Sequence, residues 1–198
     1  MRGLVKDLRT ALIAAVAMTL VLGLLYPLLV TGISQALFPG AANGSKVSFG
    51  GRVVGSRLIG QEFEGKAYFH PRPSATGYSG DATFFADVGP NSREGREEVR
   101  ENLAAYLKLN KPYDRGLTEE AVPVDAVTNS ASGVDPQISV ANARIQAHRV
   151  AAVRGLPLAE VEALIDGAVE GRGLGVFGEP GVNVLELNIA LEEAAPLR

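Results

Sequence analysis

The polar side chains best suited to chemistry lie in a proline-rich segment and on a predicted helix. His70 and Arg72 stand in YFHPRPSATGY (68–78), whose prolines fix the backbone φ angle and leave little entropy to lose on docking. An arginine presents a planar fork of N–H groups to a carboxylate or carbonyl. We therefore expect His70, Arg72 and, beside Gln146 on the later helix, Arg149 to contact a partner protein. The alternative is a buried loop that only braces the domain.

A metal site is not expected from this sequence. It would have to combine His70 and His148 with acids such as Asp81, Asp87 or Asp135. Two isolated histidines do not have the spacing of metal ligands, and the chain has no cysteine to supply a thiolate.

Two further patterns are weak. Residues 173–178 read GLGVFG and match G-x-G-x-x-G, but a dinucleotide-binding loop follows a strand and opens a helix, whereas here the motif follows a predicted helix. The cluster NSASG (129–133) lacks the G-x-S-x-G elbow of a hydrolase, and such residues usually form turns. We therefore expect no catalytic residue and no directly bound cofactor.

A long apolar run precedes all of these residues. Residues 10–45 contain no Asp, Glu, Lys or Arg, and residues 11–30 alone match the roughly 20 apolar residues that cross a bilayer. Arg2, Lys6 and Arg9 precede the run, and basic residues near a span stay in the cytoplasm. The expected organisation is a cytoplasmic tail (1–9), a transmembrane helix with an interfacial extension (10–38) and an extracytoplasmic domain (45–198).

A cleaved signal peptide is the alternative for this run, with residues 40–42 (GAA) as the cleavage site. Signal peptides have apolar regions of about 7 to 15 residues, and this run is longer, which favours a retained anchor. The span carries no ionisable side chain, so by itself it does not form an ion pathway. The net charge of −3 and the lack of a basic patch argue against nucleic-acid binding.

The remainder of the chain reads as one mixed α+β domain. Short apolar runs at 46–49 and 52–59 flank Gly50-Gly51 and predict a hairpin. Apolar spacing and capping residues predict helices over 93–109, 139–154 and 158–170. Alternating Leu185, Leu187, Ile189 and Leu191 predict a strand over 182–191.

Eight segments, in one order along almost the whole chain, carry a resemblance to a known family. They are YPLLVTGISQALFPGAANGS (26–45), GSRLIGQEF (55–63), YFHPRPSATGY (68–78), GPNS (89–92), ASGVDPQIS (131–139), QxxRVA (146–151), RGL (154–156) and GEPGVNVLELNIAL (178–191). On these motifs the chain resembles the KdpC family, the C subunits of the Kdp potassium-transporting P-type ATPases.

The resemblance implies a non-catalytic accessory subunit of an ATP-driven, high-affinity potassium import complex in the cell's inner or plasma membrane. The implied partners are a channel-like potassium-binding subunit, an ATP-hydrolysing P-type subunit and a small single-span subunit, and the complex handles ATP and potassium. In agreement, the chain has no DKTGT phosphorylation segment and no TVGYG-like filter.

Family C subunits are described as catalytic chaperones that raise ATP affinity, and Gln146 matches the glutamine linked to that role. The charge bias places Gln146 outside the cell, away from the ATP sites, so an interface role is favoured for it. The alternative function is a membrane-anchored extracytoplasmic enzyme or ligand-binding domain, which would show a deep pocket with convergent polar groups.

The orientation of the chain can be tested with a reporter fused after Arg198. Because Arg2, Lys6 and Arg9 precede the span, we expect the reporter to be active outside the cytoplasm and residues 1–9 to stay attached. A C-terminus that resists external protease in intact spheroplasts would contradict this orientation.

Overall fold

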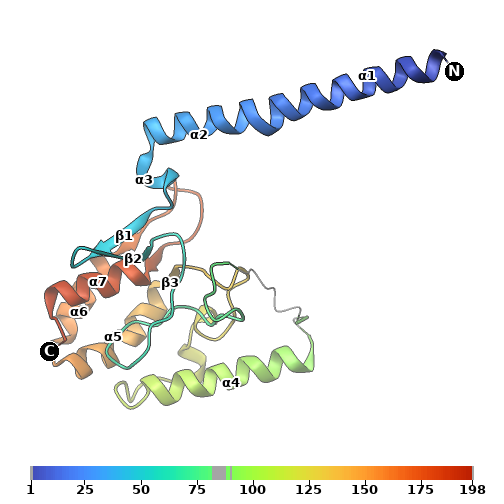
Figure 1. Ribbon diagram of the computed structural model, residues 1–198. Helices are drawn as coiled ribbons and strands as arrows, with labels where there is room; N and C mark the ends of the chain where they lie inside the picture. Colours follow the sequence, from blue (N-terminus) through green and yellow to red (C-terminus); the bar gives the residue numbers. More distant parts are fainter. Residues whose placement is uncertain (1, 82–87, 90, 198) are drawn as a thin grey trace. The chain divides into compact units, whose positions relative to one another are not determined.

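The computed structural model describes residues 2–81, 88–89 and 91–197 (Figure 1). The chain divides into two compact units, Met1–Lys46 and Val47–Arg198. The first is an apolar helix and the second is a mixed helix and sheet domain, which confirms the predicted α+β class with a single N-terminal apolar helix.

The N-terminal unit is one long helix followed by a short one. The long helix comprises α1 (Arg2–Met18), a π-helical stretch η1 (Thr19–Leu25) and α2 (Tyr26–Leu37), and α3 (Pro39–Ala42) follows. The 35 residues of Gly3–Leu37 have an apolar window with a mean hydropathy of 2.4. By length and composition this is enough to cross a bilayer.

The π-helical stretch has a physical cause in the next residues. The Tyr26 N–H donates to the carbonyl of Val21, five residues earlier. Pro27 follows directly, and a proline ring in a helix clashes with the carbonyl four residues before it. A wider turn relieves that clash without ending the helix.

The second unit contains two small sheets. β1 (Lys46–Phe49) and β2 (Arg52–Ser56) form the predicted hairpin, although β2 ends at Ser56 and not at Ile59. In the other sheet β5 (Gly181–Asn183) lies between β3 (Gln137–Ser139) and β4 (Val169–Glu170). Both pairings are antiparallel, with Ile138 opposite Val182 on one side and Val169 opposite Val182 on the other.

The predicted helices form close to their expected bounds, and two of the three begin at a side-chain cap. α4 (Arg93–Asn110) begins where the Ser92 hydroxyl accepts from the Gly95 N–H, and α5 (Val140–Arg154) begins at Ser139 in the same way. α5 ends at Gly155, whose φ of 68° is a left-handed conformation suited to glycine. α6 (Leu158–Gly167) stops short of the predicted residue 170, which lies in β4. Short 3-10 turns, η2 (Glu119–Ala121) and η3 (Val124–Ala126), fill part of the segment before β3.

The predicted strand over 182–191 is wrong. Only β5 is extended there, and α7 (Val184–Ala194) follows it directly. The Asn183 side chain caps this helix by accepting from the Glu186 N–H at 3.2 Å. Leu187 and Leu191, four residues apart, then lie on one buried face.

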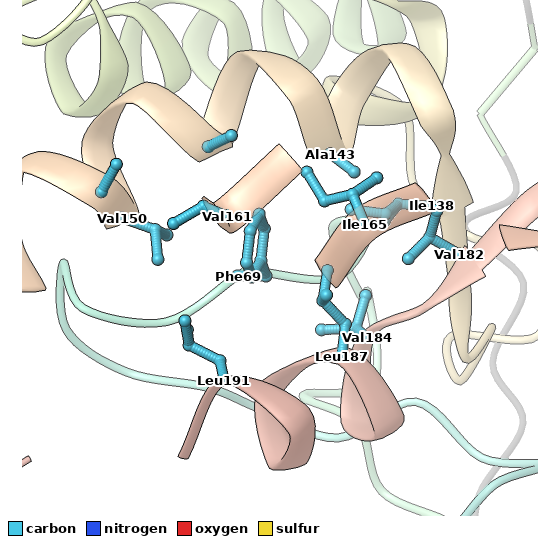
Figure 2. Close-up of a cluster of buried hydrophobic side chains, with 12 residues drawn as sticks. Phe69, Ile138, Ala143, Val150, Val161, Ile165, Val182, Val184, Leu187 and Leu191 are labelled. Atoms are coloured by element: carbon cyan, nitrogen blue, oxygen red, sulfur yellow. The ribbon is translucent and has the colours of Figure 1, made fainter. Parts of the chain in front are cut away.

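One hydrophobic core joins the sheet to α5, α6 and α7. Figure 2 shows the Phe69 ring between Val150 and Val161 on one side and Leu187 and Leu191 on the other. The buried members of the core are Phe69, Ile138, Ala143, Ala147, Val150, Ala151, Val161, Ile165, Val182, Val184, Leu187 and Leu191. A loop residue, Phe69, therefore fills the centre of the domain.

Gly60 marks a close backbone contact that can be tested. Its N–H donates to the Val134 carbonyl at 2.7 Å, and an added Cβ would lie 2.4 Å from the carbonyl oxygen of Asp135. Because that oxygen belongs to the backbone, we expect Gly60→Ala to cost about 1–3 kcal/mol and to lower the melting temperature of the full chain in detergent.

Gly167→Ala is the matched control, because a Cβ at Gly167 meets no atom within 4 Å. This control should melt close to the unchanged chain. Equal melting of the two variants would show that the contact at Gly60 is not tight.

Candidate functional site

An extended segment is held between two helices by carboxamide side chains. Asn188 of α7 accepts from the Phe69 N–H and donates to the Phe69 carbonyl, each at 2.9 Å. Gln146 of α5 does the same for His70, at 2.8 and 3.0 Å. We call residues 66–72 the clamped segment. The backbone groups of Phe69 and His70 are paired as in a sheet, but the partners are side chains.

Gln146 uses all of its side-chain hydrogen-bonding capacity inside the domain. Besides its two bonds to His70, its Oε1 accepts from Arg149 at 2.9 Å and its Nε2 donates to Asn142 Oδ1 at 3.0 Å. A carboxamide has two donors and two acceptor lone pairs, so all four positions are occupied. The residue is 2% exposed, and a ligand would have to displace an internal partner.

Arg149 is fully buried and holds the start of the clamped segment. Its Nη1 donates to the carbonyls of Lys66 and Tyr68, at 2.5 and 2.8 Å, and its Nε donates to Asn110 Oδ1 at 2.9 Å. Burial lowers the pKa of Arg149 to about 10, so the guanidinium stays charged at neutral pH. The expected direct contact of Arg149 with a partner does not fit this structure, because the side chain points inward to carbonyls that need donors.

His70 is half-buried in the clamped segment. Its ring Nε2 lies 2.7 Å from the Gly65 carbonyl and therefore carries the proton when the ring is neutral. Burial lowers the pKa of His70 and the nearby Arg149 cation lowers it further, although the bond to Gly65 opposes them. The ring is accordingly neutral at pH 7.

Arg72 joins the loop to the segment before β3. Its Nη1 lies 2.9 Å from Asp135 Oδ2, and its Nη2 donates to the Asn129 carbonyl at 3.1 Å. The Tyr78 hydroxyl donates to the Arg72 carbonyl at 2.8 Å, and burial raises the pKa of Tyr78 to about 12. About a quarter of the Arg72 side chain is exposed (26%), so it braces the loop and still reaches the surface.

A small cavity of about 220 Å³ with both polar and apolar lining residues lies between His70 and α4. Two of its lining residues are hydrogen-bonded to each other, because the Tyr106 hydroxyl donates to Asn142 Oδ1 at 2.8 Å. Asn142 Nδ2 also donates at 3.1 Å to Asp125, which is not among the residues that line the cavity. Burial raises the pKa of Tyr106, which keeps its hydroxyl protonated. No acidic side chain occurs among the described residues that line the cavity. The arrangement suits packing and positioning better than acid–base chemistry.

Comparison with known proteins identifies the family. The family model described as "KdpC: K+-transporting ATPase, c chain" matches residues 8–193. This chain belongs to the KdpC family. It is 47% identical to the potassium-transporting ATPase KdpC subunit of Rhodospirillum rubrum, over 98% of this chain and 99% of the relative. It is 51% identical to the KdpC subunit of Myxococcus xanthus, over 92% of this chain and 86% of that relative. It is 45% identical to the KdpC subunit of Mycobacterium tuberculosis, over 94% of this chain and 98% of that relative. The resemblance seen in the sequence is confirmed.

The weak patterns of this KdpC-family chain form turns. Ser130 and Ser132 bond to each other at 3.1 Å, and Ser132 donates to Asp135 at 3.0 Å, so the cluster supports the residue that pairs with Arg72. Residues 173–178 form a tight turn closed by a bridge between Gly173 and Phe177. Of the metal-ligand candidates, Asp87 lies outside the described residues. No group of three His, Asp or Glu side chains that could hold a metal occurs in the part of the chain that the structure describes.

Two residues that hold the clamped segment, Asn188 and Arg154, were not predicted from the sequence. Arg154 is paired with Glu192 at 2.5 Å, donates to the Ala67 carbonyl at 2.8 Å and lies over the Tyr68 ring, 5.0 Å from its centroid. The available signal for Asn188 was an amide within the apolar run 182–191, which also contains Asn183. A polar residue kept in such a run usually has a buried partner.

Because Gln146 and Asn188 hold the clamped segment in the same way, their substitution should destabilise the domain to a similar degree. Gln146→Ala and Asn188→Ala each leave a buried N–H and carbonyl of the clamped segment without their partner. We expect each to cost about 1–3 kcal/mol or more of folding free energy, measured by thermal or urea unfolding of the full chain in detergent.

Asn91→Ala removes an exposed amide and serves as the control. It should change stability little. If Gln146→Ala unfolds at the same midpoint as the control and the wild-type chain, the hydrogen bonds of Gln146 to His70 contribute nothing to stability.

Proposed function

We propose that this chain is the accessory C subunit of an ATP-driven, high-affinity potassium import complex. The observation that carries the proposal is the family match over residues 8–193, together with relatives named as potassium-transporting ATPase KdpC subunits that align over nearly the whole chain. The proposed partners are a channel-like potassium-binding subunit, an ATP-hydrolysing P-type subunit and a small single-span subunit.

The proposed topology follows from the charges beside the apolar helix. Residues 1–9 are cytoplasmic. Residues 10–38 form a transmembrane helix in the plasma or inner membrane, with an interfacial extension. Residues 45–198 are extracytoplasmic. Lys6 and Arg9 lie in the first turns of the helix, and no charged residue follows until Lys46. The span carries no acid or base, so potassium crosses the membrane through another subunit.

The subunit is proposed to be non-catalytic. The hydrogen bonds of Gln146 are all used internally, and the cavity beside it has no acidic side chain among its described lining residues. ATP and potassium are therefore bound by the other subunits. The chain supports ATP use by stabilising the assembled complex, as a catalytic chaperone that does not touch the nucleotide.

In this proposal Gln146 acts through the clamped segment. Its amide fixes the backbone of His70, and Arg72 lies two residues further along, partly exposed. The loop from His70 to Arg72 is the proposed contact with the channel-like subunit. Arg149 supports that contact from inside the domain and does not take part in it.

Purification of the tagged chain in mild detergent tests the function. We expect the channel-like and P-type subunits to co-purify and the complex to show potassium-stimulated ATPase activity. A chain that purifies without them would contradict the subunit role and favour an anchored enzyme or ligand-binding domain.

The same complex tests the role of Gln146. If Gln146 acts through the clamped segment, Gln146→Ala and Asn188→Ala should lower potassium-stimulated ATPase activity to a similar degree. A rise in KM for ATP with Gln146→Ala alone would instead show a direct role at the nucleotide.

A further inference from the structure

The turn that carries the G-x-G-x-x-G pattern presents apolar side chains to the outside. Residues 173–178, which we call the apolar tip, connect β4 to β5. Leu174, Val176 and Phe177 are 91%, 70% and 67% exposed. Large apolar side chains grouped in this way on an ordered turn are unusual on a freely soluble surface and indicate an interaction site.

Four N–H groups of the apolar tip are hydrogen-bonded within the turn or to the residue at its base. The N–H groups of Gly173 and Phe177 donate to each other's carbonyls at 2.8 and 2.9 Å. Those of Gly175 and Val176 donate to the carbonyls of Arg172 and Gly173, at 3.0 and 3.1 Å. In hydrocarbon an unsatisfied N–H costs several kcal/mol, so these four hydrogen bonds lower the cost of moving the turn out of water. A protein-docking strand would instead offer such groups to its partner.

The charges beside the apolar tip are neutralised at its base. Arg172 and Glu179 flank it and form an ion pair at 2.8 Å, and every residue between Gly173 and Gly178 is apolar or glycine. A long arginine side chain can keep its charged end in water while its stem lies along apolar surface. The tip is thus apolar at its end and polar at its base, which is the pattern of a segment that enters a membrane interface.

The base of the tip is bonded to a residue that follows the apolar helix closely in the sequence. Glu170 at this base pairs with Arg57 at 3.3 Å, and Asn183 donates to the Arg57 carbonyl at 2.8 Å. Arg57 follows Ser45 by only twelve residues, which extend to at most about 40 Å. The hairpin of β1 and β2 folds this length back on itself and shortens the reach further.

We propose that the apolar tip inserts Leu174, Val176 and Phe177 into the phospholipid interface of the leaflet on the domain's side of the membrane. The inserted tip gives the domain a second attachment, besides the helix, and so restricts its orientation on the bilayer. The proposal requires that the apolar helix holds the chain in a membrane, and it is independent of the orientation of that helix and of any role in potassium transport.

Two single-cysteine variants test the proposal, because the chain has no cysteine of its own. Val176→Cys places a label on the tip, and Val124→Cys in η3 is the matched control, since Val124 is 71% and Val176 70% exposed. Each full-length variant carries a nitrobenzoxadiazole label in vesicles of phosphatidylethanolamine and phosphatidylglycerol. Quenching by nitroxide on the lipid acyl chains is compared with quenching by iodide present on both sides of the membrane.

We expect the label at position 176 to be blue-shifted and quenched severalfold more by the lipid nitroxide than the label at position 124, which iodide should quench. Leu174→Cys should repeat the result and guards against a local effect of one label. Iodide quenching at 174 and 176 as strong as at 124 would overturn the proposal. Protection of the tip from both quenchers, seen only in the complex with other subunits, would overturn it in favour of a protein contact.

Discussion

The buried charge of Arg149 is the constraint on which the rest of the domain depends. Its hydrogen-bond partners among the described residues are neutral: the carbonyls of Lys66 and Tyr68 and the amide oxygens of Asn110 and Gln146. A cation without a carboxylate beside it must be stabilised by such dipoles, and an unpaired buried charge costs about 3–5 kcal/mol. The relative positions of α4, α5 and the clamped segment are therefore fixed by the hydrogen bonds of Arg149.

The same constraint explains why a proline-containing loop runs through the core. An extended backbone in an apolar interior needs a partner for its N–H and carbonyl groups, and residues 66–70 belong to neither of the two sheets in the described part of the chain. The carboxamides of Gln146 and Asn188 supply both a donor and an acceptor to one residue each, and Arg149 and Arg154 supply further donors. Phe69 can then fill the centre of the core although it belongs to no helix or strand.

The elements with caps and clear periodicity could be predicted from the sequence, and the direction of the polar side chains could not. Ser92, Ser139 and Gly155 marked helix ends correctly. The run 182–191 fits a period of two and a period of 3.6 equally well, and only Asn183 with Glu186 three residues later signalled a helix start. Arg149 was expected to contact a partner beside Gln146, whereas it is buried and donates to the carbonyls of Lys66 and Tyr68. Charged residues are seldom fully buried, so the sequence alone did not indicate this direction. The need of the clamped segment's carbonyls for hydrogen-bond donors can be seen only once the segment lies beside α5 in the folded domain.

In the proposed role as an accessory subunit, the occupied hydrogen bonds of Gln146 limit how the domain could influence ATP use. A side chain whose donors and acceptors are all paired gains nothing from a nucleotide unless an internal partner is lost, and that loss is costly in a buried network. An effect on ATP affinity must then come from a difference in how the domain contacts two states of its complex. Coupling of this kind is typically worth about 1–3 kcal/mol, or roughly 5- to 150-fold in affinity, which one well-placed contact can supply. In the proposed complex, the hydrogen bonds of Gln146 and Asn188 would couple a contact at the loop to α5 and α7.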